Sequence, residues 1–167
     1  KEKRQGLTFA RNKGFDSAKH EIIARIDADV VTPPNWIEMI KINFEAKDID
    51  ALSGPVVYYD LPLRSPKLSS IYQKSLKIYL RNSNVLLGPN MVITKEIWKK
   101  ARTKVNLKDS LVHEDIDLTI NILKSGGKIK FDKELIVETS GRRIKKRPIS
   151  FFVDYPIRIA KTFWVNR

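Results

Sequence analysis

The chain has 167 residues, no cysteine and a hydrophobic content of 42%, which together argue against a disulfide framework, a thiolate metal site and a wholly disordered chain. Its net charge of +13, from 32 Lys and Arg against 19 Asp and Glu, favours a polyanionic partner: nucleic acid, anionic lipid or a phosphorylated small molecule. No apolar run reaches the roughly 18 residues that a membrane-spanning helix needs, and no signal-peptide core follows the charged first residues.

The first part of the chain alternates predicted helices and strands. A short helix is predicted over residues 7–20, and the apolar run after it predicts a buried strand over residues 21–27. Two prolines then signal the start of a second helix, because proline is favoured in a first helical turn. The apolar face of that helix is formed by Trp36, Ile40 and Phe44.

A second strand is predicted over residues 51–59, with an interruption at Gly54 where a bulge or a close backbone approach is expected. A helix over residues 67–81 follows a proline-bearing loop. Its apolar side is predicted to consist of Leu68, Tyr72, Leu76 and Tyr79.

The alternation continues to residue 140. A strand pair or bent strand is expected around Gly88, then helices over residues 95–101 and 113–124, and a last strand or hairpin within residues 128–140. This order predicts an α/β fold with a mostly parallel sheet and helices on both faces. In such sheets ligands bind beyond the carboxyl ends of the strands.

Two carboxylates, Asp27 and Asp29, follow the first predicted strand. Residues two apart on an extended chain point to the same side, so the two charges converge. A divalent cation with oxygen ligands, Mg²⁺ or Mn²⁺ shared with substrate phosphates, would offset their repulsion. The alternative is an exposed turn in which Asp29 caps the next helix, and the pair in isolation favours that turn.

Four motifs occur in a fixed order over residues 7–147. They are "ARNKGFDSAKHEIIARIDADVVTPPNWIE", "GPNMVITKEIWKKA", "HEDIDLTINILKSGGKIKF" and "ETSGRRIKKRP". This series resembles the inverting family 2 glycosyltransferases, with their Ala-Arg-Asn-x-Gly helix, Asp-x-Asp strand end, glycine-led strand and Glu-Asp-x-Asp-Leu helix. Four ordered motifs are far more specific than any one of them.

The resemblance implies a GT-A-like fold, that of the nucleotide-diphospho-sugar transferases, in an N-terminally incomplete copy that lacks the family's first nucleotide-binding strand. It implies an enzyme that moves a sugar from a UDP- or GDP-sugar to an acceptor hydroxyl with inversion, assisted by Mg²⁺ or Mn²⁺. Where many GT-A enzymes place a late histidine metal ligand, this chain has Thr139, Ser140, Gly141 and Arg142.

The resemblance also assigns roles to particular residues. Asp115 would be the general base, with Glu114 beside it, and Asp27 and Asp29 would hold the metal. Donor binding would fall to Arg11, Asn12, Asp27, Asp29, Arg142 and Arg143. The acceptor site would be floored by Gly88, Pro89 and Asn90.

Each assignment has a structural alternative. Glu114 and Asp115 could simply complement the dipole at a helix start. Arg142 and Arg143 could be solvated charges in a basic run. Arg11, by the resemblance, would lie near the nucleotide base.

Three regions are expected from the same comparison: residues 1–59 as the second half of the nucleotide-sugar-binding region, 60–140 as the acceptor-binding and catalytic-base region, and 141–167 as a basic, aromatic tail. Apolar residues recur at helical spacing in that tail, namely Phe152, Tyr155, Ile159 and Phe163. Flanked by basic residues, they predict either a helix in a membrane interface or a helix packed on the core.

The partners expected are therefore a nucleotide-diphosphate sugar, a lipid-linked or polysaccharide acceptor and an anionic membrane surface, with the protein cytoplasmic or peripheral at the cytoplasmic membrane face. Two other function classes compete. One is a basic nucleic-acid-binding domain, although no recognised binding motif occurs and the aromatic residues fall at core spacing. The other is a catalytically silent membrane-docking module of the same fold.

Overall fold

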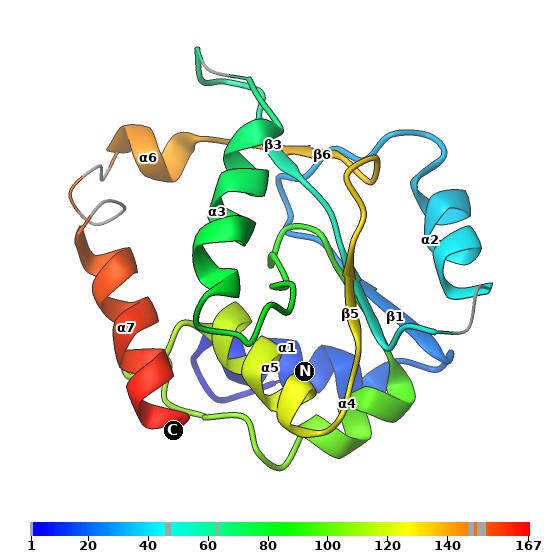
Figure 1. Cartoon of the computed structure of the whole chain (residues 1–167), viewed down its shortest axis with the longest axis vertical. Helices are drawn as coiled ribbons and strands as arrows, with labels where there is room; N and C mark the ends of the chain where they lie inside the picture. Colours follow the sequence, from blue (N-terminus) through cyan, green and yellow to red (C-terminus); the bar gives the residue numbers. More distant parts are fainter. Residues whose placement is uncertain (1, 46–47, 63, 147–148, 150–152) are drawn as a thin grey trace.

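The computed structural model describes residues 2–45, 48–62, 64–146, 149 and 153–167 (Figure 1). In chain order its elements are α1 (Leu7–Ser17), β1 (Ile22–Arg25), α2 (Trp36–Glu45), β2 (Ala51–Ser53), β3 (Val56–Tyr58), α3 (Lys67–Lys77), β4 (Met91–Thr94), α4 (Lys95–Ala101), α5 (Glu114–Lys124), β5 (Ile129–Phe131), β6 (Val137–Thr139), α6 (Arg142–Lys146) and α7 (Tyr155–Val165). Among these residues no helix is long and apolar enough to cross a membrane.

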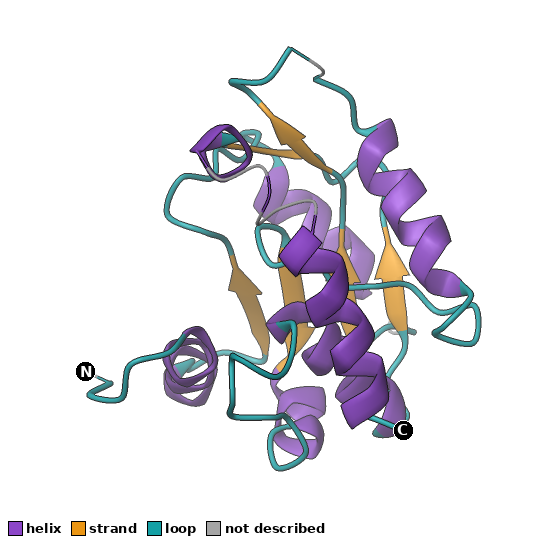
Figure 2. Ribbon diagram, turned by 90° about the vertical axis from the view of Figure 1, so that its left-hand side faces the viewer, coloured by secondary structure: helices purple, strands orange, loops and turns teal. Residues whose placement is uncertain are grey.

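Four strands form the main sheet, in the order β1-β4-β2-β5. Strand β4 is antiparallel to both β1 and β2, whereas β5 is parallel to β2, so β1, β2 and β5 share one direction (Figure 2). The prediction of an α/β fold is confirmed, and the sheet is mixed: β1, β2 and β5 are mutually parallel in direction, whereas β4 runs against both of its neighbours.

Helices cover both faces of this sheet. On one face Met91 and Ile93 of β4 belong to a core with Trp98 of α4 and Leu118 of α5. On the other face Val92 packs with α2 residues in a second core. The alternation along β4 follows from strand geometry, because successive side chains point to opposite faces.

Strand β2 and strand β3 belong to different sheets, because the chain bends between them at Gly54. A β-carbon there would lie 2.0 Å from the Leu135 carbonyl oxygen, so only glycine permits this backbone approach. β3 pairs in parallel with β6 in a separate two-stranded sheet, while β5 pairs with β2. Residues 128–140 therefore hold two strands in two sheets and do not form a hairpin.

Strand β1 is less buried than its apolar sequence predicts. Ile23 is buried, but Ile22 and Ile26 are exposed. Within the described sheet β1 is an edge strand that pairs only with β4. The prediction of a buried strand is therefore wrong for this arrangement, and the strand leads directly to an exposed turn.

Helices α3 and α5 also differ from their predicted faces. Leu68 and Tyr79 are exposed, whereas Gln73 is buried and its side-chain amide clamps the backbone of Val85 through bonds of 2.6 and 2.8 Å. Helix α5 is buried on almost every side, because α7 covers its outer face and the Thr162 hydroxyl accepts the His113 amide at 2.6 Å. The spacing of apolar residues along α5 does not indicate that a second helix covers its outer face.

Candidate active site

The carboxylates after β1 lie in a turn that is tied to β6. The Val30 amide donates to the Asp27 carbonyl at 3.1 Å, and the next residue, Val31, exchanges two backbone hydrogen bonds with Glu138. The side chains of Asp27 and Asp29 are 43% and 37% exposed. They are open to a ligand, as the strand-end prediction requires.

Asp29 lies against the segment that follows β6. The Thr139 hydroxyl donates to one Asp29 oxygen at 3.3 Å, and the Arg142 guanidinium lies 3.9 Å from the other. Residues from the stretch that replaces the family's late histidine are thus in contact with Asp29. This contact adds positive charge beside the carboxylate pair.

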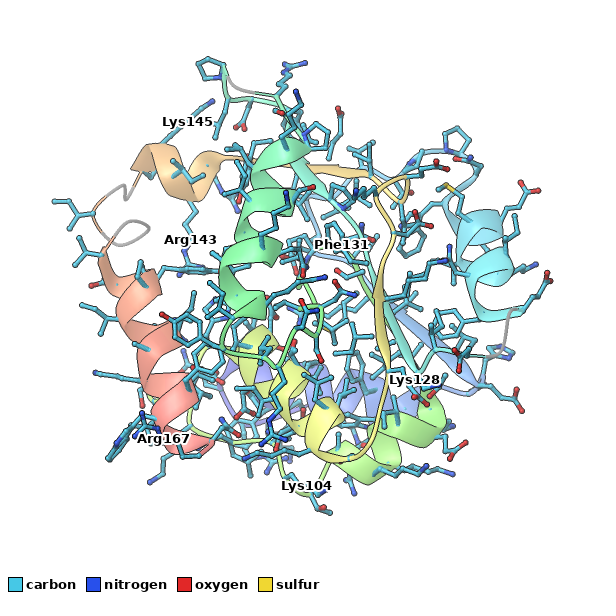
Figure 3. The ribbon with its side chains drawn as sticks, viewed as in Figure 1. Lys104, Lys128, Phe131, Arg143, Lys145 and Arg167 are labelled. Carbon is cyan, nitrogen blue, oxygen red and sulfur yellow. The ribbon has the colours of Figure 1, made fainter. Side chains whose placement is uncertain are left out.

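Helix α6 distributes its basic residues over two directions (Figure 3). Arg143 points toward α3. Burial raises the pKa of Tyr58 above its usual value, and the positive charge of Arg143 acts against that rise. Lys145 turns the other way, to Asp60, at 3.3 Å. Arg147, at the end of the basic run, lies outside the described residues.

Glu114, the first residue of α5, is held between two arginines. Its carboxylate lies 2.7 Å from Arg11 and 2.7 Å from Arg25, and the side chains of Arg11 and Glu114 are only 1% and 4% exposed. Burial opposes ionisation, but a hydrogen bond with Asp115 and the two guanidinium charges lower the pKa of Glu114 to about 2. Glu114 is therefore an ionised, enclosed carboxylate.

Asp115 lies at the next position with the opposite tendency. Its carboxylate accepts the Gly88 amide at 3.0 Å and lies 3.4 Å from Arg25. Burial and the negative charge of Glu114 raise the pKa of Asp115 well above its usual value, although Arg25 and the Gly88 amide act against the rise. A carboxylate with a raised pKa is better suited to accept a proton near neutral pH.

Gly88 allows this carboxylate to approach the loop before β4. A β-carbon at Gly88 would lie 2.7 Å from an Asp115 oxygen, which is too close for an undisturbed contact. The glycine predicted at the acceptor floor thus makes room for Asp115. Pro89 is half-buried beside it.

Asn90, the third residue assigned to the acceptor, is fully buried and has a different task. Its amide oxygen accepts from the Trp36 indole at 3.2 Å, and its amide nitrogen donates to the Leu135 carbonyl at 2.6 Å. These bonds join α2 to the segment before β6. Asn90 therefore has a structural role in the protein, and its contact with an acceptor stays a prediction.

On α1, the two residues assigned to donor binding, Arg11 and Asn12, are hydrogen-bonded to each other. The guanidinium of Arg11 is shared between Glu114 and the Asn12 side-chain oxygen, which accepts from it at 2.9 and 3.1 Å. With its side chain buried, Arg11 presents no surface to a nucleotide base. Arg11 is an ion-pair partner of Glu114, and its role in donor binding stays a prediction.

Arg25 is the site residue that motif comparison missed. It lies at the end of β1, and its guanidinium contacts Glu114, Asp115 and Asp27. A signal was present in the sequence, because Arg25 precedes Asp27 by two residues on a strand and so shares its side. Nothing in the sequence alone indicated that α5 would reach the same place.

The oxygen donors suit a shared metal site. No group of three or more His, Cys, Asp or Glu within the described residues could hold a metal ion. Asp27 and Asp29 supply two exposed carboxylates, and Mg²⁺ or Mn²⁺ is commonly bound by one or two carboxylates together with substrate phosphates. The residues therefore fit a cation that arrives with, or is completed by, a diphosphate.

A groove with a volume of about 610 Å³ runs between α3 and α7. Its lining is mostly apolar and aromatic, with Leu76, Ile159, Phe163 and the exposed Tyr79 and Trp164. Of the residues predicted for the apolar face of the tail, the three that the structure describes face α3 here, which favours packing on the protein. The fourth, Phe152, lies outside the described residues.

Tyr72 and Tyr155 connect this groove to the candidate base. They form a hydrogen-bonded pair, and both have a pKa raised by burial and by the charge of Asp115. The His113 ring packs edge-on against Tyr155 at 4.2 Å, and burial lowers its pKa to about 4. Two residues of the groove lining, Tyr72 and Tyr155, are therefore close enough to Asp115 to feel its charge.

Comparison with known proteins supports the fold. A mannosyltransferase from Pyrobaculum calidifontis, solved with GDP-Man and Mn²⁺, matches with a TM-score of 0.61 at 16% identity, over 89% of this chain and 39% of that one. A mycobacterial protein matches with a TM-score of 0.52 at 13% identity, over 82% of this chain and 42% of that one. At these identities the matches show the GT-A-like fold alone.

Sequence comparison identifies the family. An uncharacterized glycosyltransferase of Methanocaldococcus jannaschii is 26% identical over 177 residues, which cover 99% of this chain and 58% of that protein. The chain thus spans a little over half the length of this relative. The family model described as glycosyl transferase family 2 matches residues 1–101, well over half of the sequence, and the chain therefore belongs to glycosyl transferase family 2.

Proposed function

We propose that this protein transfers a sugar, with inversion, from a nucleotide-diphosphate donor to an acceptor hydroxyl. One observation carries the proposal: the Arg25 guanidinium lies 3.4 Å from Asp27 and 3.4 Å from Asp115. Arg25 and Asp115 are 90 residues apart in sequence. Asp27, one of the two strand-end carboxylates, and the proposed base therefore both contact the same side chain.

Donor binding is assigned to the open carboxylate pair. Asp27 and Asp29 would hold Mg²⁺ or Mn²⁺ together with the donor diphosphate, and the cation would offset the negative charge that develops on the leaving group. The Mn²⁺ and GDP-Man present in the Pyrobaculum mannosyltransferase support a donor of this class. Arg142, beside Asp29, adds a positive charge on the same side.

Asp115 is assigned the proton transfer. Its ionised carboxylate would take the proton of the acceptor hydroxyl while that oxygen bonds to the sugar C1 and the bond from C1 to the diphosphate oxygen breaks. Because the acceptor attacks from the face opposite the leaving group, a single displacement inverts C1. The raised pKa of Asp115 makes it a stronger base than an ordinary aspartate.

The transfer is tested by measuring release of the nucleoside diphosphate from UDP- and GDP-sugars in the presence of Mn²⁺. We expect release to require the cation and to increase with the correct acceptor. A protein that binds nucleoside diphosphate but releases none from any sugar would support the silent-module alternative. Salt-dependent retention on DNA without nucleotide binding would support the nucleic-acid alternative.

Substituting Asp29 with asparagine should weaken Mn²⁺-dependent binding of a nucleoside diphosphate by about tenfold or more, because a metal ligand loses its charge. Thermal stability should hardly change, since the side chain is exposed and its contacts with the described residues are the long ones to Thr139 and Arg142. Calorimetric titration measures the affinity. Asp48→Asn is the matched control, because Asp48 is an exposed carboxylate that pairs with Lys128; equal affinities for the two variants would contradict the metal assignment.

A membrane surface is proposed as the acceptor environment. Tyr79 and Trp164 are exposed at the α3–α7 groove. Basic residues lie on both helices, such as Lys74 of α3 and Lys161 of α7, and Arg167 beyond the end of α7 also lines the groove. Aromatic side chains with a basic surround suit an anionic lipid interface. A lipid-linked acceptor would then meet the groove whose lining includes Tyr72 and Tyr155, the two tyrosines that feel the charge of Asp115.

Vesicle cosedimentation tests this surface. The Tyr79→Ser, Trp164→Ser double variant should bind anionic vesicles several-fold more weakly than wild type, and added salt should weaken binding by both proteins. Truncation of the tail is a poorer test, because Thr162 and Asn166 of that segment support α5. Ile37→Ser, Ile42→Ser on α2 serves as the control, since both side chains are equally exposed there; equal losses from the two double variants would contradict the groove surface.

A further inference from the structure

We infer that Arg25 is a positioning residue, which fixes the place of the Glu114–Asp115 pair relative to the carboxylates proposed to bind the donor. This inference rests on the proposed function for its meaning in catalysis. The two terminal nitrogens of the Arg25 guanidinium contact different carboxylates. Nη1 lies 2.7 and 3.0 Å from the Glu114 oxygens and 3.4 Å from Asp115, whereas Nη2 lies 3.4 Å from Asp27.

The burial of Arg25 separates it from a substrate-binding residue. Its side chain is 16% exposed, whereas that of Asp27 is 43% exposed. The guanidinium therefore lies beneath the open carboxylates, between them and the start of α5. A rigid planar group that donates in several directions suits this place, because it fixes the relative positions of its acceptors.

Charge balance gives Arg25 a second consequence. Glu114 and Asp115 are adjacent carboxylates in a poorly hydrated site, and the charge of Glu114 disfavours ionisation of Asp115. The charge of Arg25 acts on both and lowers the pKa of Asp115 against the other influences. Without Arg25, Asp115 should hold its proton to a higher pH and be a usable base over a narrower range.

Arg11 provides the internal comparison. It also contacts Glu114, at 2.7 Å, but no ion pair joins it to Asp115 or Asp27 among the described residues. A merely structural role for Arg25 would make the two arginines equivalent. A positioning role predicts that only Arg25 affects the titration of Asp115.

The groups that face Asp115 come from several elements. They are Glu114 on its own helix, Arg25 from β1, the Gly88 amide before β4, Tyr72 from α3 and Tyr155 from α7. The two tyrosines have raised pKa values and stay neutral where Asp115 titrates. Among these groups Arg25 carries the positive charge, so its removal should raise the pH at which Asp115 loses its proton.

The experiment compares Arg25→Gln and Arg25→Lys with Arg11→Lys. Carbon-13 NMR of labelled aspartate carboxyl groups follows the titration of Asp115, whose signal is assigned by its loss in Asp115→Asn. In Arg25→Gln the midpoint should rise by about one pH unit or more, and in Arg25→Lys by less, because lysine keeps the charge. Arg11→Lys is compared with Arg25→Lys, because both keep the charge; in Arg11→Lys the midpoint should stay within a few tenths of a unit of wild type, since Arg11 pairs with Glu114 and not with Asp115 among the described residues.

Steady-state kinetics provide the catalytic readout. In Arg25→Gln the acid limb of the kcat profile should move with the NMR midpoint, so that turnover falls about tenfold at neutral pH and recovers as the pH rises. A loss that is constant with pH, or an unchanged NMR midpoint, would overturn the inference. A titration shift in Arg25→Gln together with a wild-type protein that turns over no nucleotide sugar would instead contradict the proposed function.

Discussion

Asp115→Asn should reduce turnover by about 10² or more while donor affinity stays near that of wild type. Asparagine preserves the size of the side chain and can still accept the Gly88 amide, but it cannot take a proton from an acceptor hydroxyl. The interaction removed acts in the transition state, so kcat should fall and the donor Kd should not. Rates of nucleoside diphosphate release, with calorimetric donor affinities, measure the two effects.

The pH dependence supplies an independent check on Asp115. A general base must be ionised, and the raised pKa of Asp115 means that wild-type kcat should increase with pH through a midpoint above that of an ordinary aspartate. This acid limb should be missing from the residual activity of Asp115→Asn. Wild-type turnover in the variant, or an unaltered acid limb, would refute the assignment.

The structural alternative for Asp115 makes a different prediction. A residue that only supports the helix start would be replaced by asparagine with little effect, since asparagine is nearly as good at helix N-termini. In the structure Asp115 accepts from the Gly88 loop, and α5 is preceded by His113 without a side-chain cap. The Asp115 carboxylate thus bonds to the Gly88 loop, which is a different segment from its own helix, and this favours the catalytic hypothesis.

The fold was largely predictable because its elements have strong local signals. Helix α4 follows the predicted residues 95–101, and Thr94 caps it by accepting the Ile97 amide at 3.1 Å. The bend at Gly54 was also signalled by the sequence. The pairing of β5 with β2 and of β6 with β3 was not, because parallel partners are selected by long-range packing and carry no short-range signature.

The candidate site was predictable in its motifs and less so in its contacts. Asp27 and Asp29 lie at an open strand end, as their spacing indicates. Arg11 and Asn90 belong to matched motifs, yet their side chains are used inside the protein by Glu114, Trp36 and Leu135 instead of by a ligand. A motif identifies the neighbourhood of a site, whereas burial decides which side chains can touch a substrate.

Removing the buried cation at Arg11 should have the largest effect on stability. Arg11→Met leaves the Glu114 carboxylate in a nearly inaccessible site with Arg25 as its remaining ion-pair partner among the described residues. Breaking one side of a buried ion pair typically costs about 3 to 5 kcal/mol. Because Arg25 still compensates Glu114, we expect the free energy of unfolding to fall by about 3 kcal/mol at neutral pH, as measured by urea denaturation.

The pH dependence of this loss distinguishes the ion pair from simple packing. The pKa of Glu114 is lowered from 4.5 to about 2, so its pairing stabilises the folded protein above the unfolded-state pKa and is lost as the pH falls toward about 2. The difference between wild type and Arg11→Met should therefore narrow over that window. Lys100→Met is the control, because Lys100 and Glu96 form an exposed pair whose loss should hardly change the stability. A deficit in Arg11→Met that is the same at neutral and acidic pH would mean that the methylene packing of Arg11, and not its charge on Glu114, stabilises the start of α5.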